Sequence, residues 1–245
     1  MSSAGYAEPV PAVASASSAG IRARLADGTR WRAIRVVAQT GSTNADLLAP
    51  GTADGTVLVA EHQTGGRGRF DRSWLDSPGT AISLSVLIRP RRKPADWGWL
   101  SLLTGLSVAL GLRTLAGSSD RAQVKWPNDV LLDDRKVCWV LCETAPGPAA
   151  VLGMGVNVSM SESELPVPTA TSLLLAGLPT DKDAVIGTVL VQLDQLLRRW
   201  EAGDDLRPEY LAACSTIGRR VQLQWDAEQH SPALVTGVAV GIDRA

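Results

Sequence analysis

Residues 65–74 read GGRGRFDRSW, which places three arginines and three glycines within ten positions. Arginine holds phosphate or carboxylate groups through paired, charge-assisted hydrogen bonds. Glycine lets the backbone turn tightly or lie close to a ligand. The stretch matches neither a Walker-type phosphate loop nor a dinucleotide-binding glycine motif. Because apolar, strand-like runs flank it at residues 56–63 and 80–90, we expect an ordered loop that binds an anion.

A second group of charged residues lies in KWPNDVLLDDRK, residues 125–136. It brings Lys125, Asp129 and Lys136 within twelve positions, around a bend that Pro127 makes rigid. DDRK is expected to form the turn of a hairpin, so that the two lysines can share one site. Taken alone, the group is better explained as an ordinary charged hairpin with exposed lysines.

The strands that would position these groups are indicated by short apolar runs. They are expected over residues 30–40, 56–63, 80–90 and 149–160. Within 80–90 the apolar residues alternate with Ser83 and Ser85, so the two serines should share the opposite side of the strand.

Helices are indicated by apolar residues at helical spacing. They are expected from a cap at Ser42 or Thr43, over 96–117, over 181–203 and over 208–215. Gly203 is the expected end of the third. Hairpin strands with helices before, between and after them predict an α+β fold. We expect a disordered tail over residues 1–20, one main domain over 21–215 and a small β-unit over 216–245.

Composition excludes several classes of function. The 24 basic and 25 acidic residues leave a net charge of −1, so there is no basic field for DNA binding. Three cysteines fit reduced thiols in the cytoplasm better than a disulfide framework. With only two histidines, a zinc site is not expected. No apolar run reaches the roughly 18 residues of a membrane-spanning helix.

Six motifs, in order and spacing, resemble those of biotin protein ligases of the type without an N-terminal DNA-binding domain. They are GSTNADLL, AEHQTGGRGR, AISLSVLIRP, KWPNDVLL, DRKV and GMGVNV. The similarity runs from about Ile34 to the C-terminus. It implies a catalytic domain with a central mixed sheet flanked by helices. It also implies a C-terminal β-barrel with more strands than residues 216–245 can form, so we expect that barrel to be partial.

The resemblance implies a reaction in two steps. Biotin and ATP, with Mg²⁺, form biotinyl-5′-adenylate, and the biotinyl group then passes to a lysine of the biotin carboxyl carrier domain of an acyl-CoA carboxylase. Such a reaction brings anions together and needs fixed cations more than a protein nucleophile. Biotin, ATP and Mg²⁺ would be substrates rather than tightly bound groups. We expect no DNA or membrane partner, and a monomer or weak homodimer.

The same resemblance assigns residues to roles. Lys136 and Arg69 correspond to catalytic residues. The biotin-binding positions are Ser42, Thr43, Asn44, Gln63, Gly66, Arg67 and Lys136. The ATP- and phosphate-binding positions are Arg67, Gly68, Arg69, Arg72, Trp126, Asn128 and Asn157. Asp129 is assigned to metal binding or to orienting a lysine. For Trp126 a core position, and for Asn157 a structural hydrogen bond within the sheet, stay open as alternatives.

Two residues depart from the family pattern. The family follows its catalytic lysine with K-x-x-G-I-L, whereas this chain reads KVCWVL and has Trp139 at the glycine position. An indole there would fill ligand space or shift the strand. Asp71 replaces a glycine in the loop and could pair with Arg69 or Arg72. These departures keep one alternative open, a non-catalytic protein that binds biotin or the carrier. A lipoate or octanoate ligase is a second alternative because it shares the fold, although GRGR and KWPND favour biotin.

Overall fold

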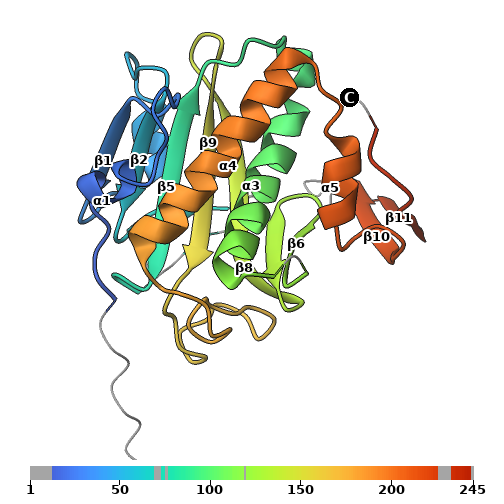
Figure 1. Ribbon diagram of the computed structural model, residues 1–245. Coiled ribbons are helices and arrows are strands. Elements are labelled where there is room, and N and C mark those ends of the chain that lie inside the picture. The colour runs from blue at the N-terminus through green and yellow to red at the C-terminus, as the bar shows by residue number, and fades with distance from the viewer. Residues whose placement is uncertain (1–12, 69–72, 75–76, 119, 226–232, 244–245) are drawn as a thin grey trace, which may run out of the picture.

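The structure is a computed structural model that describes residues 13–68, 73–74, 77–118, 120–225 and 233–243. Its centre is a seven-stranded sheet (Figure 1). In spatial order the strands are β1 (Ala33–Val37), β2 (Thr56–Ala60), β5 (Ala81–Ile88), β9 (Ala149–Asn157), β8 (Arg135–Ala145), β7 (Asp129–Leu132) and β6 (Ala122–Lys125). Only β1 and β2 pair in parallel within this sheet. The expected α+β fold with a mixed sheet is therefore confirmed.

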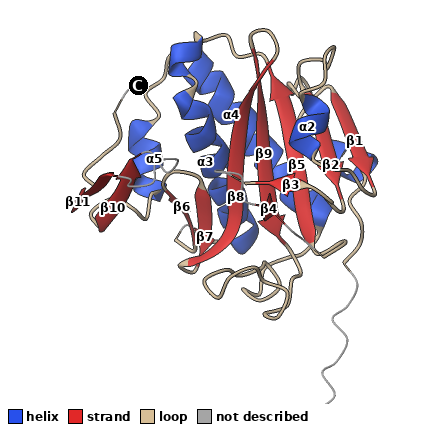
Figure 2. Ribbon diagram, turned by 180° about the vertical axis from the view of Figure 1, so that it is seen from behind, coloured by secondary structure: helices blue, strands red, loops and turns tan. Residues whose placement is uncertain are grey.

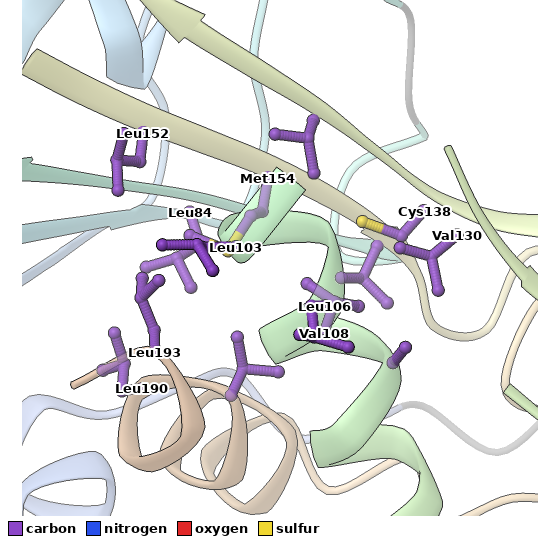
Figure 3. Packing of buried hydrophobic residues seen from close by; sticks show 14 of the residues in the cluster. Leu84, Leu103, Leu106, Val108, Val130, Cys138, Leu152, Met154, Leu190 and Leu193 are labelled. Carbon is purple, nitrogen blue, oxygen red and sulfur yellow. The ribbon is translucent and has the colours of Figure 1, made fainter. Parts of the chain in front are cut away.

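Two long helices cover one face of the sheet (Figure 1). They are α3 (Gly98–Ala116) and α4 (Lys182–Ala202), and Gly203 ends α4 in the left-handed conformation, as expected. Leu103 and Leu106 of α3 and Leu193 of α4 pack with strand residues in the main core (Figure 3). α3 is long and apolar enough to span a membrane, but it packs against both α4 and the sheet and is mostly buried.

The opposite face carries the short helix α2 (Thr43–Leu47), which begins at its expected cap (Figure 2). The Oγ of Ser42 accepts a hydrogen bond from Ala45 N at 3.4 Å. Leu47 packs on Leu58 of β2 and Leu87 of β5 in a second apolar cluster. Because helices lie on both faces, β5 is buried along its whole length and its serines are not exposed.

The hairpin turn forms as the sequence predicts, and the described ends of the arginine-rich stretch pair as two short strands. β3 (Gly66–Arg67) pairs with β4 (Ser73–Trp74) and makes an ordered base for the arginine-rich stretch. Asp133 and Asp134, both with positive φ, form the turn between β7 and β8. Aspartate tolerates this conformation in tight hairpin turns.

The chain ends differ in part from expectation. Residues 1–12 lie outside the described residues, but the tail does not extend to residue 20. Helix α1 (Ser18–Arg22) is capped by Ser17, and Ala16 is buried. At the other end, α5 (Arg207–Ala213) precedes β10 (Arg220–Trp225) and β11 (Ala233–Val238), which pair as a two-stranded sheet. A barrel stays an expectation there. A 3₁₀ turn, η1 (Pro94–Asp96), leads into α3.

Candidate functional site

Five buried polar residues meet on the α2 face of the sheet, and we call them the polar cluster: Ser42, Thr43, Asn44, Gln63 and Ser85. The Oε1 of Gln63 accepts hydrogen bonds from Thr43 N at 2.7 Å and from Thr43 Oγ1 at 3.0 Å. The Oγ of Ser85 lies 2.7 Å from Thr43 Oγ1 and 2.6 Å from Asn44 Oδ1. Buried groups that hold one another in this way form a preorganised binding surface.

Asn44 connects the polar cluster to the arginine loop. Its Nδ2 donates to Leu141 O at 3.1 Å and to Glu143 Oε2 at 2.7 Å, and Arg67 forms an ion pair with Glu143 at 3.3 Å. A Cβ at Gly153 would overlap the Asn44 amide, so glycine is required for this close approach. The structure thus brings together five of the seven predicted biotin-binding residues, namely Ser42, Thr43, Asn44, Gln63 and Arg67.

Lys136 lies at the start of β8, whereas Leu141 and Glu143 lie toward its end. Its Nζ forms an ion pair with Asp129 Oδ1 at 2.6 Å. Lys125 lines the same hollow of about 350 Å³, together with Thr169 and Arg219. Lys125 and Lys136 therefore line one hollow, and their sharing of a functional site stays a prediction. We call this region the lysine hollow.

A β-bulge decides which way Lys136 points. The pairing of β7 with β8 shifts between Val130 and Leu131, so that Leu131 faces Lys136 and Asp129 faces Trp139. Leu131 and Asp129 are two residues apart and share one face, so Lys136 and Trp139 share it too. Without the extra residue that the bulge adds to β8, Lys136 and Trp139 would lie on opposite faces, because they are three positions apart.

Trp139 lies between the lysine hollow and the polar cluster along β8. Its cross-strand partner is Gly155, and a Cβ there would overlap the indole ring. The indole is 7% exposed and packs with Ala81 and Met160. β8 and β9 keep an unbroken register, so the strand has not shifted to accommodate it. The indole lines the cavity at the polar cluster, and its occupation of ligand space stays a prediction.

The cavity at the polar cluster is accordingly small. It measures about 20 Å³ and is lined by Trp139, Leu141 and Met154 besides polar residues. That is room for about one water molecule. Arg67 lines this cavity whereas Lys136 lines the lysine hollow, so these two predicted partners do not meet in one pocket.

The fit between Trp139 and Gly155 gives a test of the packing. Gly155→Ala is expected to lower the free energy of unfolding by about 1–3 kcal/mol, because the new methyl group must displace the indole. Chemical denaturation measures the change. In a Trp139→Gly background the same substitution should cost almost nothing, and an equal loss in both backgrounds would show that the indole is not the obstacle.

Three predicted nucleotide-binding residues have identifiable contacts. Asn128 donates from Nδ2 to Val140 O at 3.0 Å, which ties the WPND bend to β8. Asn157 donates to Thr171 O at 2.8 Å, while its buried Oδ1 accepts no hydrogen bond from the described residues. The Nδ2 of Asn157 thus makes a structural hydrogen bond, and its Oδ1 is left to accept a bond from a nucleotide. Trp126 is 41% exposed, so the core alternative for it is wrong.

The predictions for the tip of the arginine loop fall partly outside the described residues. These are the catalytic role of Arg69, phosphate binding by Arg72 and the effect of Asp71. Gly66 and Gly68 are described and lie at the base of the loop, on either side of Arg67. Their roles stay predictions.

Sequence analysis missed two polar residues beside the site, Ser85 and Glu143. The alternation of apolar residues with Ser83 and Ser85 in residues 80–90 indicated a polar side of the strand, and this pattern could have identified Ser85. Glu143 had no such signal, because its meeting with Asn44 and Arg67 depends on strand pairing. Among the described residues no group of three or more possible metal ligands occurs. Asp129 is paired with Lys136, which agrees with the lysine-orienting alternative for it, and its role in metal binding stays a prediction.

Cys138 and Cys142 are poorly suited to act as nucleophiles. Burial raises the pKa of Cys138, and it raises the pKa of Cys142 to about 12 against an opposing hydrogen bond from Thr104. The thiolate is the reactive form of cysteine. We therefore expect iodoacetamide at about pH 8 to leave both thiols unmodified in the folded protein and to alkylate them in denaturant. Mass spectrometry checks this, and rapid labelling of the folded chain would contradict it.

Known proteins resemble this chain in sequence and in fold. A family model described as the biotin/lipoate A/B protein ligase family matches residues 34–159. The biotin–acetyl-CoA-carboxylase ligase of Mycobacterium tuberculosis H37Rv is 42% identical over 224 residues, covering 88% of this chain and 82% of that protein. The biotin protein ligase of Aquifex aeolicus, in complex with biotin and ATP, has a TM-score of 0.74 at 27% identity, covering 87% and 89% of the two chains. A Leishmania major ligase with biotinyl-5-AMP, at 18% identity, 85% and 99% coverage and a TM-score of 0.61, shares the fold.

Proposed function

Because this chain belongs to the biotin/lipoate A/B protein ligase family, we propose that it forms biotinyl-5′-adenylate and transfers the biotinyl group to a carrier-domain lysine. One observation carries the proposal: the polar cluster and Lys136 lie along one face of the sheet. Biotin requires such an arrangement because its polar ureido ring lies far from its carboxylate. We propose residues 21–215 as the catalytic domain and 216–245 as part of a C-terminal unit.

The polar cluster favours biotin over lipoate. A ureido ring has two N–H donors and a carbonyl acceptor, and the five polar side chains can exchange their mutual bonds for bonds to it. A dithiolane ring offers neither, so its binding would gain nothing from Gln63, Thr43 or Ser85. Sites built for hydrogen bonds discriminate strongly against ligands that lack them.

Lys136 would act where the charges meet. In the first step a carboxylate oxygen of biotin attacks the α-phosphorus of ATP, and the bond to pyrophosphate breaks. Both reactants are anions, so a fixed cation that stabilises the charge of the transition state lowers the barrier. Asp129, 2.6 Å from Lys136 Nζ, orients that cation. Mg²⁺ would arrive with ATP as part of the substrate.

In the second step the amine of the carrier lysine attacks the activated carbonyl, and AMP leaves with the electrons of the acyl–phosphate bond. We propose as partner the carrier domain of an acyl-CoA carboxylase, because the M. tuberculosis relative is named for such a substrate. Asn157 Oδ1 and the exposed Trp126 are proposed to bind the nucleotide, and the three free cysteines favour a cytoplasmic location.

Trp139 supports a second candidate, a non-catalytic relative that binds the carrier. The indole fills the cleft between the polar cluster and Lys136, so biotin can reach both only if the indole moves. This candidate predicts a chain that binds the carrier domain but does not activate biotin.

Pyrophosphate release from ATP and Mg²⁺ separates the candidates when biotin, octanoate and lipoate are compared. Release with biotin, followed by labelling of the carrier lysine, supports the ligase. Release only with octanoate or lipoate would assign another acid. No release with any acid, together with binding of the carrier domain, would favour the non-catalytic relative.

A further inference from the structure

Lys182 is a buried charge that the proposed reaction does not use. It is the first residue of α4, is 2% exposed and forms an ion pair with Glu61. Lysine is almost never buried so completely unless it is paired. Removing one partner of such a pair leaves the other as a buried, uncompensated charge. Glu61 is therefore held firmly by the helix layer of the fold.

Glu61 stands at the base of the segment that carries the arginine loop. Its backbone oxygen accepts a hydrogen bond from Gly79 N at 3.0 Å, so the two ends of segment 62–78 meet at this residue. Its Oε1 also accepts a hydrogen bond from Ala16 N at 2.7 Å. The N-terminal segment, the loop base and α4 thus meet at one carboxylate.

A short covalent path leads from Glu61 to the polar cluster. Gln63 is two residues away, and its Oε1 accepts hydrogen bonds from Thr43. Between them, His62 O accepts a hydrogen bond from Thr40 N at 3.1 Å. Arg67 follows four residues later and pairs with Glu143. A shift at Glu61 would therefore displace both side chains.

We propose that Lys182 and Glu61 form a clamp that positions residues 62–67, acting from the helix layer on Gln63 and Arg67, which are assigned to substrate binding on the α2 face. Both are positioning residues, because their side chains line neither the polar cavity nor the lysine hollow. The kinetic consequence rests on the proposed ligase function, whereas the structural consequence does not.

Lys182→Met tests the clamp, because methionine keeps the length of the side chain and removes its charge. Arg67 makes trypsin a direct probe of order in residues 62–67. We expect cleavage there to become roughly tenfold faster than in the parent, relative to cleavage elsewhere in the chain. The dissociation constant for biotin, measured calorimetrically, should rise roughly tenfold, because small displacements of binding groups are costly.

The matched control is Arg24→Gln. It removes an exposed ion pair with Asp181 at the same end of α4, and such pairs contribute little. It should change neither cleavage nor biotin binding. Glu61→Gln, which keeps the shape of the side chain, provides a second variant if Lys182→Met folds poorly.

The kinetic readout separates positioning from stability. With an active parent, the KM for biotin should rise more than kcat falls, because Gln63 and Arg67 are assigned to substrate binding. A lowered melting temperature with unchanged cleavage at Arg67 and unchanged biotin affinity would overturn the clamp. If the parent releases no pyrophosphate, the ligase proposal fails, and the cleavage assay still decides the clamp.

Discussion

Lys136→Ala is expected to abolish adenylate formation, lowering kcat/KM for pyrophosphate release by roughly 10²–10³-fold. The substitution removes the cation assigned to the meeting point of carboxylate and phosphate, and it leaves Asp129 without its ion-pair partner. A lone carboxylate there would repel both substrates. Initial rates at several biotin and ATP concentrations measure the effect.

Lys125→Ala is the matched comparison. It removes the same charge from the same hollow but leaves the Lys136–Asp129 pair intact. We expect a loss of less than about tenfold, because a cation that does not meet the reacting atoms contributes only to the surrounding field. Equal losses in the two variants, or normal turnover by Lys136→Ala, would refute the assigned role of Lys136.

Trp139→Gly is expected to strengthen biotin binding by roughly 10- to 100-fold. In the parent the indole must leave its contact with Gly155, Ala81 and Met160 before the ligand can span the cleft. Exposing a buried side chain of this kind costs about 1.5–3 kcal/mol or more, and a tenfold change in affinity corresponds to about 1.4 kcal/mol. Isothermal titration with biotin measures the gain directly.

Trp139→Phe provides the control for size, and an intermediate affinity is expected. The glycine variant should also unfold more easily, because removing a large buried aromatic side chain costs about 3–5 kcal/mol. Titrations should therefore be run well below its melting temperature. If biotin binds the parent as tightly as the glycine variant, the indole does not obstruct the cleft.

Several features around the candidate site were predicted from the sequence because they depend on residues close together in the chain. Ser42 caps a helix, Asp133 and Asp134 make a turn, and both depend on neighbouring residues only. Gln63 and Thr43 were assigned by motif, and the structure brings them into contact. The predicted end of the disordered tail at residue 20 was wrong. Ala16 and Ser17 are small residues of the kind found in disordered tails, but they form hydrogen bonds with Glu61 and Asp183 far along the chain.

Local sequence patterns determined the order of the helices and strands. They also determined the chemistry of the two charged groups, the arginine loop and the lysine-containing hairpin. Tertiary structure decided how those groups are joined. The bulge beside Val130 turns Lys136 onto the face of Trp139, and the register of β8 with β9 sets that indole over Gly155. Both depend on the alignment of separate strands, which no local run of residues encodes. For the same reason, the Lys182–Glu61 pair appears only when α4 packs on the sheet.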